Sequence, residues 1–181
     1  MIEKLFPLWL TIACCWYITD TPAGDRAIMM AEPYVGHVEF THNSSPFIDY
    51  INGRMGLPPG TNYCATFAAY ILDSAKVEFP AVRSAVAQHY IIRESIPARD
   101  VMTGARTVPV GSLAIWRRGD TWMGHVEFVR EEWTGPDGKT IGANTSPGDV
   151  GSQANGNGIW ARDRRIIPTA YFRITHFTET R

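Results

Sequence analysis

The stretch of sequence that decides the fold is Asn62-Tyr63-Cys64-Ala65-Thr66-Phe67-Ala68-Ala69-Tyr70-Ile71-Leu72-Asp73-Ser74-Ala75. Its apolar residues recur with the 3.6-residue period of a helix that buries one face. Asn62 is a favoured N-terminal cap, so we expect Cys64 to lie in the first helical turn. There the unpaired N–H groups and the positive end of the helix dipole stabilise a thiolate. This placement indicates a nucleophile, whereas a cysteine that only fills the core more often lies in the middle of an element.

The other cysteines offer no alternative chemistry. The chain has three, and Cys14 and Cys15 are adjacent near the N-terminus, so they form neither a disulfide framework nor a spaced zinc site. There is no Asp-rich calcium loop either. We therefore expect no metal and no cofactor.

The first half of the chain is predicted to be helical. Residues 25–32 can form a short helix. Ser45 is a suitable cap and Pro46 suits a first helical position, which predicts a second helix that stops near Gly53. A further helical stretch is expected over residues 81–90.

The second half is predicted to form strands. Gly135-Pro136-Asp137-Gly138 indicates a hairpin turn. Helices followed by an antiparallel sheet predict an α+β domain. The expected strands cover residues 112–117, 125–133, 139–144, 158–162 and 171–176.

A base for the cysteine is found on one of these strands. His125 follows Gly124, which leaves room for a substrate, and strand alternation sends His125 and Glu127 to the same face. The hairpin can bring Asn144 beside His125, where a polar group would fix the imidazole tautomer. A histidine on a strand is by itself more often structural, but cysteine, histidine and asparagine in this order are more specific. Gly-His-Val-Glu-Phe also occurs at residues 36–40, so His37 is a competing base, and we interpret that copy as coincidence.

Three motifs resemble one family. They are Asn62-Tyr63-Cys64-Ala65-Thr66-Phe67, Gly124-His125-Val126-Glu127-Phe128-Val129 and Ala143-Asn144-Thr145-Ser146-Pro147-Gly148. They resemble the CHAP group of cysteine amidohydrolases/peptidases, within the papain-like NlpC/P60 superfamily, over about residues 30–176. The resemblance implies N-terminal helices packed on an antiparallel β-sheet, and cleavage of amide bonds in bacterial peptidoglycan. It also implies that Cys64 is the nucleophile, His125 the general base and Asn144 the polar group that orients it.

Two positions depart from the family pattern. Many members have an acidic residue two positions before this asparagine, where this chain has Gly142. The position two after the histidine is often small, and here it is Glu127. Glu127 can raise the basicity of His125, replace the missing acid or contact a substrate amine, or it can be a solvated strand residue. Tyr63 and Trp122 are candidates for the cleft wall, or ordinary core and surface aromatics.

Composition sets the wider limits. A chain of 181 residues fits one domain, which we place at residues 25–181. With 17 Lys+Arg, 18 Asp+Glu and a formal charge of −1, no nucleic-acid partner is expected. The run at residues 162–165 is interpreted as a solvated edge.

Residues 1–24 form a hydrophobic leader in this interpretation. Residues 5–19 carry no charge, which suits a signal peptide, a lipoprotein signal or a membrane anchor, or else a helix packed on the domain. The first three readings predict a cell-envelope or secreted protein of bacterial or phage origin, with possible membrane association through residues 5–19.

The sequence thus predicts a peptidoglycan amidase or endopeptidase that works through an acyl-enzyme, with peptidoglycan or a peptide as its partner. Two alternatives are open. The absence of an acid at Gly142 motivates an inactive papain-like module that binds the cell wall or is structural. A cysteine peptidase acting on protein is the other alternative. The bond cleaved and the oligomeric state do not follow from the sequence.

Overall fold

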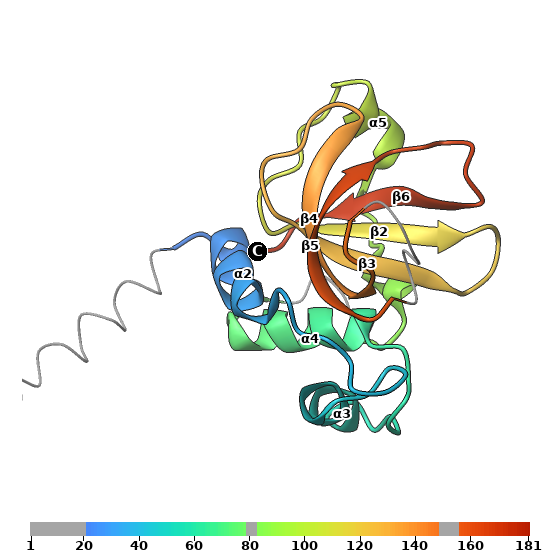
Figure 1. Cartoon of the computed structure of the whole chain (residues 1–181). Helices are drawn as coiled ribbons and strands as arrows, with labels where there is room; N and C mark the ends of the chain where they lie inside the picture. Colours follow the sequence, from blue (N-terminus) through green and yellow to red (C-terminus); the bar gives the residue numbers. More distant parts are fainter. Residues whose placement is uncertain (1–20, 79–82, 149–155) are drawn as a thin grey trace, which may run out of the picture.

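A computed structural model describes residues 21–78, 83–148 and 156–181 (Figure 1). The expected leader, Cys14 and Cys15 included, lies almost wholly outside these residues. Within the described ranges, no helix combines the length and the apolar character needed to cross a bilayer.

The helices of the first half lie close to their predicted positions. They are α2 (Ala23–Ala31), the 3-10 turn η1 (Glu32–Tyr34), α3 (Pro46–Gly53) and α4 (Cys64–Ser74). The Ser45 cap of α3 is confirmed, because its Oγ accepts a hydrogen bond from Ile48 N at 3.2 Å. The expected domain boundary at residues 24/25 falls inside α2, where the Gly24 Cα approaches the Val110 carbonyl so closely that a Cβ would lie 1.9 Å from its oxygen.

Six strands of the described residues form one antiparallel sheet in the order β1-β6-β2-β3-β4-β5, which confirms the α+β class. The strands are β1 (Ile96–Pro97), β2 (Leu113–Arg118), β3 (Gly124–Val129), β4 (Asp137–Thr145), β5 (Gly158–Arg165) and β6 (Phe172–Thr178). β3 and β4 pair with Glu127 opposite Gly142. This register pairs β3 with β4 in antiparallel fashion, as the predicted hairpin between the two strands requires.

Several boundaries differ from the predictions. Of the helix expected over residues 81–90, the described part forms only the 3-10 turn η2 (Ala87–Tyr90). The strand expected over 125–133 ends at Val129, and Trp133 instead pairs with Val108 and packs its ring 5.0 Å from that of Phe177. The helix α5 (Ala98–Met102) and the short strand β1 were not predicted, because neither is long enough to show a period.

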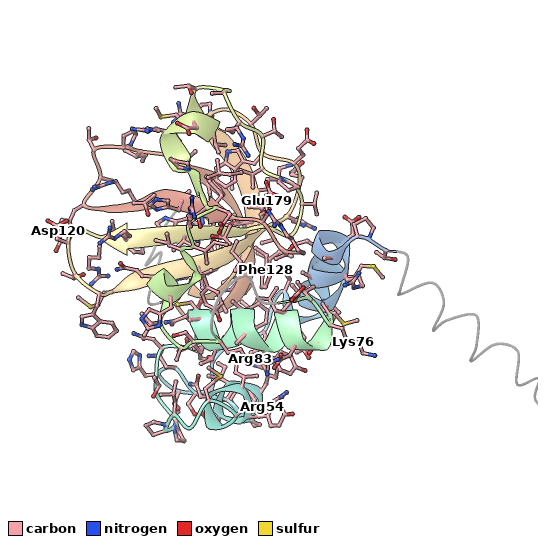
Figure 2. The ribbon with its side chains drawn as sticks, turned by 180° about the vertical axis from the view of Figure 1, so that it is seen from behind. Arg54, Lys76, Arg83, Asp120, Phe128 and Glu179 are labelled. Carbon is pink, nitrogen blue, oxygen red and sulfur yellow. The ribbon has the colours of Figure 1, made fainter. Side chains whose placement is uncertain are left out.

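The sheet separates two apolar clusters. α4 crosses one face of the sheet, with α3 below it, and α5 lies on the opposite side (Figure 1). Phe128 lies between the sheet and α4, and its ring meets that of Phe67 edge to face at 6.5 Å (Figure 2). Trp116 belongs to the second cluster and packs against the ring of His125 at 5.4 Å. As predicted from alternation, β3 therefore sends Phe128 to the helices and His125 to the side of Trp116. His125 is the second residue of β3 and still lies close enough to the first residue of α4, Cys64, for the thiol to act on its pKa.

Candidate active site

Cys64 is the first residue of α4 and is 8% exposed. The residue before the helix is Tyr63, which makes no side-chain cap, so the predicted Asn62 cap is wrong. Asn62 instead accepts hydrogen bonds from Asn43 and Asn144 at 3.0 and 3.2 Å. The first N–H groups of a helix have no partner within it, and the N-cap residue Tyr63 supplies no side-chain acceptor to them. The thiol therefore lies beside backbone donors that an anion can use.

His125 is buried at the start of β3 and presents two different nitrogens. Its Nε2 lies 2.8 Å from Oε1 of Glu127. Its Nδ1 has no hydrogen-bond partner among the described residues, and the Cys64 thiol lies close enough to act on the pKa of the imidazole. Burial alone would lower the pKa of His125, but the Cys64 thiol and the Glu127 carboxylate together raise this pKa to about 9.

Glu127 is 1% exposed, so the interpretation as a solvated strand residue is wrong. Its Oε2 accepts hydrogen bonds from Thr140 Oγ1 at 2.6 Å and from Arg164 Nε at 2.8 Å. A second Arg164 nitrogen, Nη2, donates to Oε1. Burial would raise the pKa of Glu127, but the Arg164 cation and the His125 contact hold it far below its usual range. An ionised Glu127 keeps one imidazole proton on Nε2, so Nδ1 is the nitrogen that exchanges a proton with the Cys64 thiol.

The absence of a side chain at Gly142 leaves room for the carboxyl group of Glu127. It lies directly opposite Glu127 in the β3–β4 register. A Cβ on Gly142 would lie 2.2 Å from Oε1 and 2.4 Å from Cδ of Glu127. The carboxyl group of Glu127 thus fills the space in front of position 142.

Within the described residues, Asn144 forms no hydrogen bond with His125. It lies at a bulge in β4 with a φ of 59°, and its Nδ2 donates to Asn62 Oδ1 at 3.2 Å. The imidazole contact that we expected of Asn144 is made by Glu127. The φ explains the difference, because the left-handed conformation turns Asn144 out of the strand alternation.

The two candidate aromatics have different surroundings. Tyr63 is fully buried and donates to Glu39 Oε1 at 2.9 Å, so it is a core residue and not part of the cleft wall. Burial, together with Glu39, raises the pKa of its phenol well above 10. Trp122 is 73% exposed and lines a cavity of about 600 Å³ together with Cys64.

His37 is excluded as the base by its contacts. Its Nε2 lies 2.8 Å from Ser45 Oγ, and its ring packs on Phe47 at 5.4 Å. The first copy of the repeated motif is an extended segment that pairs with β5 through a bridge from Val38 to Gly158. That copy supports the fold, and the second copy forms the candidate site.

Sequence reasoning missed Arg164 and Thr140. The run at residues 162–165 was interpreted as a solvated edge, but Arg164 is only 8% exposed, whereas Arg165 is exposed and pairs with Asp137. The signal was available, since strand alternation over β5 sends Arg164 inward and Arg165 outward. The positive charge of Arg164 compensates the buried carboxylate of Glu127.

Comparisons with protein-family models, with curated proteins and with solved structures find no match. In the described part of the chain, no group of three or more His, Cys, Asp or Glu side chains is placed to hold a metal ion.

Proposed function

We propose that this protein is a papain-like cysteine amidohydrolase/peptidase of the CHAP type that hydrolyses amide bonds in bacterial peptidoglycan. One observation carries the proposal. The buried His125 is held at Nε2 by Glu127 and has an unpartnered Nδ1 near a cysteine at the N-terminus of a helix. A nucleophile, a base and a group that orients the base are the parts that covalent amide hydrolysis requires.

Acylation follows from the order of these groups. His125 Nδ1 takes the thiol proton, and the Cys64 sulfur attacks the amide carbonyl carbon. The carbonyl oxygen becomes an oxyanion, and the free N–H groups of the first α4 turn are the donors that stabilise it. When the tetrahedral intermediate collapses, the C–N bond breaks and His125 returns the proton to the leaving amine. A thioester on Cys64 remains.

Deacylation reverses the proton path. His125 Nδ1 takes a proton from water, and the resulting hydroxide attacks the thioester carbonyl. The C–S bond breaks, the proton returns to the sulfur, and a carboxylic acid leaves. Glu127 stays ionised throughout and stabilises the imidazolium that forms in each half-reaction.

Three motifs that resemble the CHAP family support peptidoglycan as the substrate. A substrate in the cell wall implies a cell-envelope or secreted location for the protein. The alternative of an inactive module was motivated by the missing acid at Gly142. Glu127 argues against this alternative, because its carboxylate already occupies the space in front of that glycine.

The deciding experiment incubates the full chain and its Cys64→Ala variant with purified peptidoglycan and identifies the products by mass spectrometry. We expect new amine and carboxyl ends from the parent protein and none from Cys64→Ala. Ser74→Ala is a matched control, since Ser74 is an exposed residue at the other end of α4. Equal product from the parent protein and Cys64→Ala would disprove the mechanism. Wall binding without any product would favour the binding module, and cleavage of denatured casein alone would favour a protein peptidase.

A further inference from the structure

The cavity at Cys64 has an uneven chemical character. One part of its wall is apolar and comes from the segments before and within η2 and from the turn between β2 and β3. Among the described residues, no aspartate or glutamate lines the cavity, and Arg118 is the one lysine or arginine that does. The residues around this cavity include Cys64, Val86, Ala87, Arg118, Trp122 and Met123.

The side chain of Arg118 lies on an aromatic ring and has no carboxylate partner among the described residues. It is the last residue of β2, and its guanidinium lies over the ring of Phe172 at 5.4 Å. The ring of Phe172 is in turn 6.4 Å from the ring of His125. The carboxylate ion pairs of the described residues involve other arginines, and Arg118 is not among them. A cation held on an aromatic face beside the reacting groups, without a counter-ion, is suited to an anionic ligand.

The turn that carries Trp122 is fixed in position. Gln88 of η2 donates from Nε2 to the carbonyl oxygens of Thr121 and Met123 at 2.7 and 2.8 Å. Asp120, on the same turn, lies at the end of the sheet farthest from Glu179 (Figure 2). The apolar wall is therefore formed before a ligand arrives, which reduces the entropy lost on binding.

We infer that Arg118 determines specificity by binding a free carboxylate of the substrate, while Trp122 packs against the substrate's apolar or sugar part. The substrate is then a peptide with an unblocked carboxylate near the scissile amide. This inference rests on the proposed function, because it assigns the group that the same site recognises. A contact between Arg118 and a free carboxylate would make the protein prefer anionic wall peptides to those whose carboxylates are amidated.

The first test needs no natural substrate. The thiol of Cys64 is alkylated in the full chain by iodoacetate, which is an anion, and by iodoacetamide, which is neutral; in each case an S–C bond forms and iodide leaves. The ratio of the two rate constants removes any change in the reactivity of the thiol itself. We expect this ratio to fall about tenfold in Arg118→Met, as expected for the loss of one attractive charge, and to be partly kept in Arg118→Lys. Arg99→Gln is the matched control, since Arg99 is an exposed arginine of α5 outside this cavity, and its ratio should not change.

The second test uses soluble peptidoglycan fragments, half of them treated with carbodiimide and ammonia to convert carboxylates to amides. We expect the parent protein to cleave the free-carboxylate fragments with a KM at least about tenfold lower, and Arg118→Met to lose this preference. Equal cleavage of both materials by the parent protein, or an unchanged alkylation ratio in Arg118→Met, would overturn the role of Arg118. If neither material is cleaved, the proposed function fails together with the substrate class, and the alkylation ratio still decides whether Arg118 draws anions to Cys64.

Discussion

At the residue scale, the site depends on the two ends of one imidazole. Nε2 of His125 is held by Glu127, and Glu127 is held by Arg164 and Thr140, all of them buried. Such a chain of hydrogen bonds is stable only when every member has its partner. The consequences of breaking it can be predicted for stability and for pH dependence separately.

Glu127→Gln tests the buried pair. The change leaves the Arg164 cation without its counter-ion, so we expect the free energy of unfolding to fall by about 3–5 kcal/mol. Glu131→Gln is the control, because Glu131 is about half exposed and pairs with Lys139 at the surface, where solvent screens the pair and a much smaller loss is expected. Urea unfolding of both variants measures the difference. Equal destabilisation of the two variants would contradict the buried network.

Acid should weaken the parent protein through the same carboxylate. The pKa of Glu127 is lowered in the folded state, so its contribution is complete above about pH 4.5 and is lost as the pH falls below that value. Stability measured between pH 6 and pH 2.5 should therefore fall more steeply for the parent protein than for Glu127→Gln. Parallel curves for the two proteins would argue against an ionised Glu127.

The raised pKa of His125 predicts an alkaline limit to activity. With a pKa of about 9, the imidazole keeps its proton for the leaving amine up to that pH and loses it above. We expect kcat/KM on peptidoglycan to decline above about pH 9, and to decline at a lower pH in Glu127→Asp if the shorter carboxylate holds the imidazolium less well. The sign for stability is the same, because a raised pKa stabilises the fold below pH 6.5 and the gain disappears as the pH rises from 6.5 to about 9. A flat kcat/KM profile through pH 10 would contradict this assignment.

At the element scale, the β3–β4 register decides which side chain reaches the imidazole. Alternation on β3 was predictable and placed Glu127 beside His125, because period 2 is an intrinsic property of a strand. The contact expected of Asn144 was not found, since the bulge at Asn144 turns it toward Asn62. A bulge depends on the pairing of β4 with β5, which distant residues fix, so a local pattern could not reveal it.

The register also predicts an exchange of positions. Gly142→Ala should disturb the site, because a Cβ there collides with the carboxyl group of Glu127. If Glu127→Gly is combined with Gly142→Glu, the carboxylate approaches the imidazole from the opposite strand. We expect Glu127→Gly alone to lower kcat/KM by about 100-fold and the double variant to recover at least part of that loss. An additive loss in the double variant would show that position 142 cannot supply the carboxylate.

At the scale of the whole molecule, the site lies where helices and sheet meet. Cys64 belongs to the helical layer, and His125 and Glu127 belong to the sheet. Their spacing therefore depends on the apolar cluster that holds α4 against β3, in which Phe67 meets Phe128. A loosened interface should affect catalysis as well as stability.

Phe67→Ala measures that dependence. Removing a fully buried ring should lower the free energy of unfolding by about 3–5 kcal/mol, and kcat should fall because Cys64 and His125 lose their fixed separation. The exposed Tyr50→Ala is the control and should change neither quantity by much. If Phe67→Ala is destabilised but folded and its kcat is unchanged, catalysis does not depend on the packing of α4 against β3.

The sequence by itself determined the α+β class, the order of the main elements, and the position of a cysteine at a helix start. These follow from local periodicity and from residue types that keep their preferences in any fold. The tertiary structure decided that Glu127 contacts His125, that Arg164 is buried beside it, that Tyr63 lies in the core, and that Arg118 remains unpaired at the cavity. The physical reason is that these contacts join residues far apart in the chain, and the pairing of strands and layers fixes them.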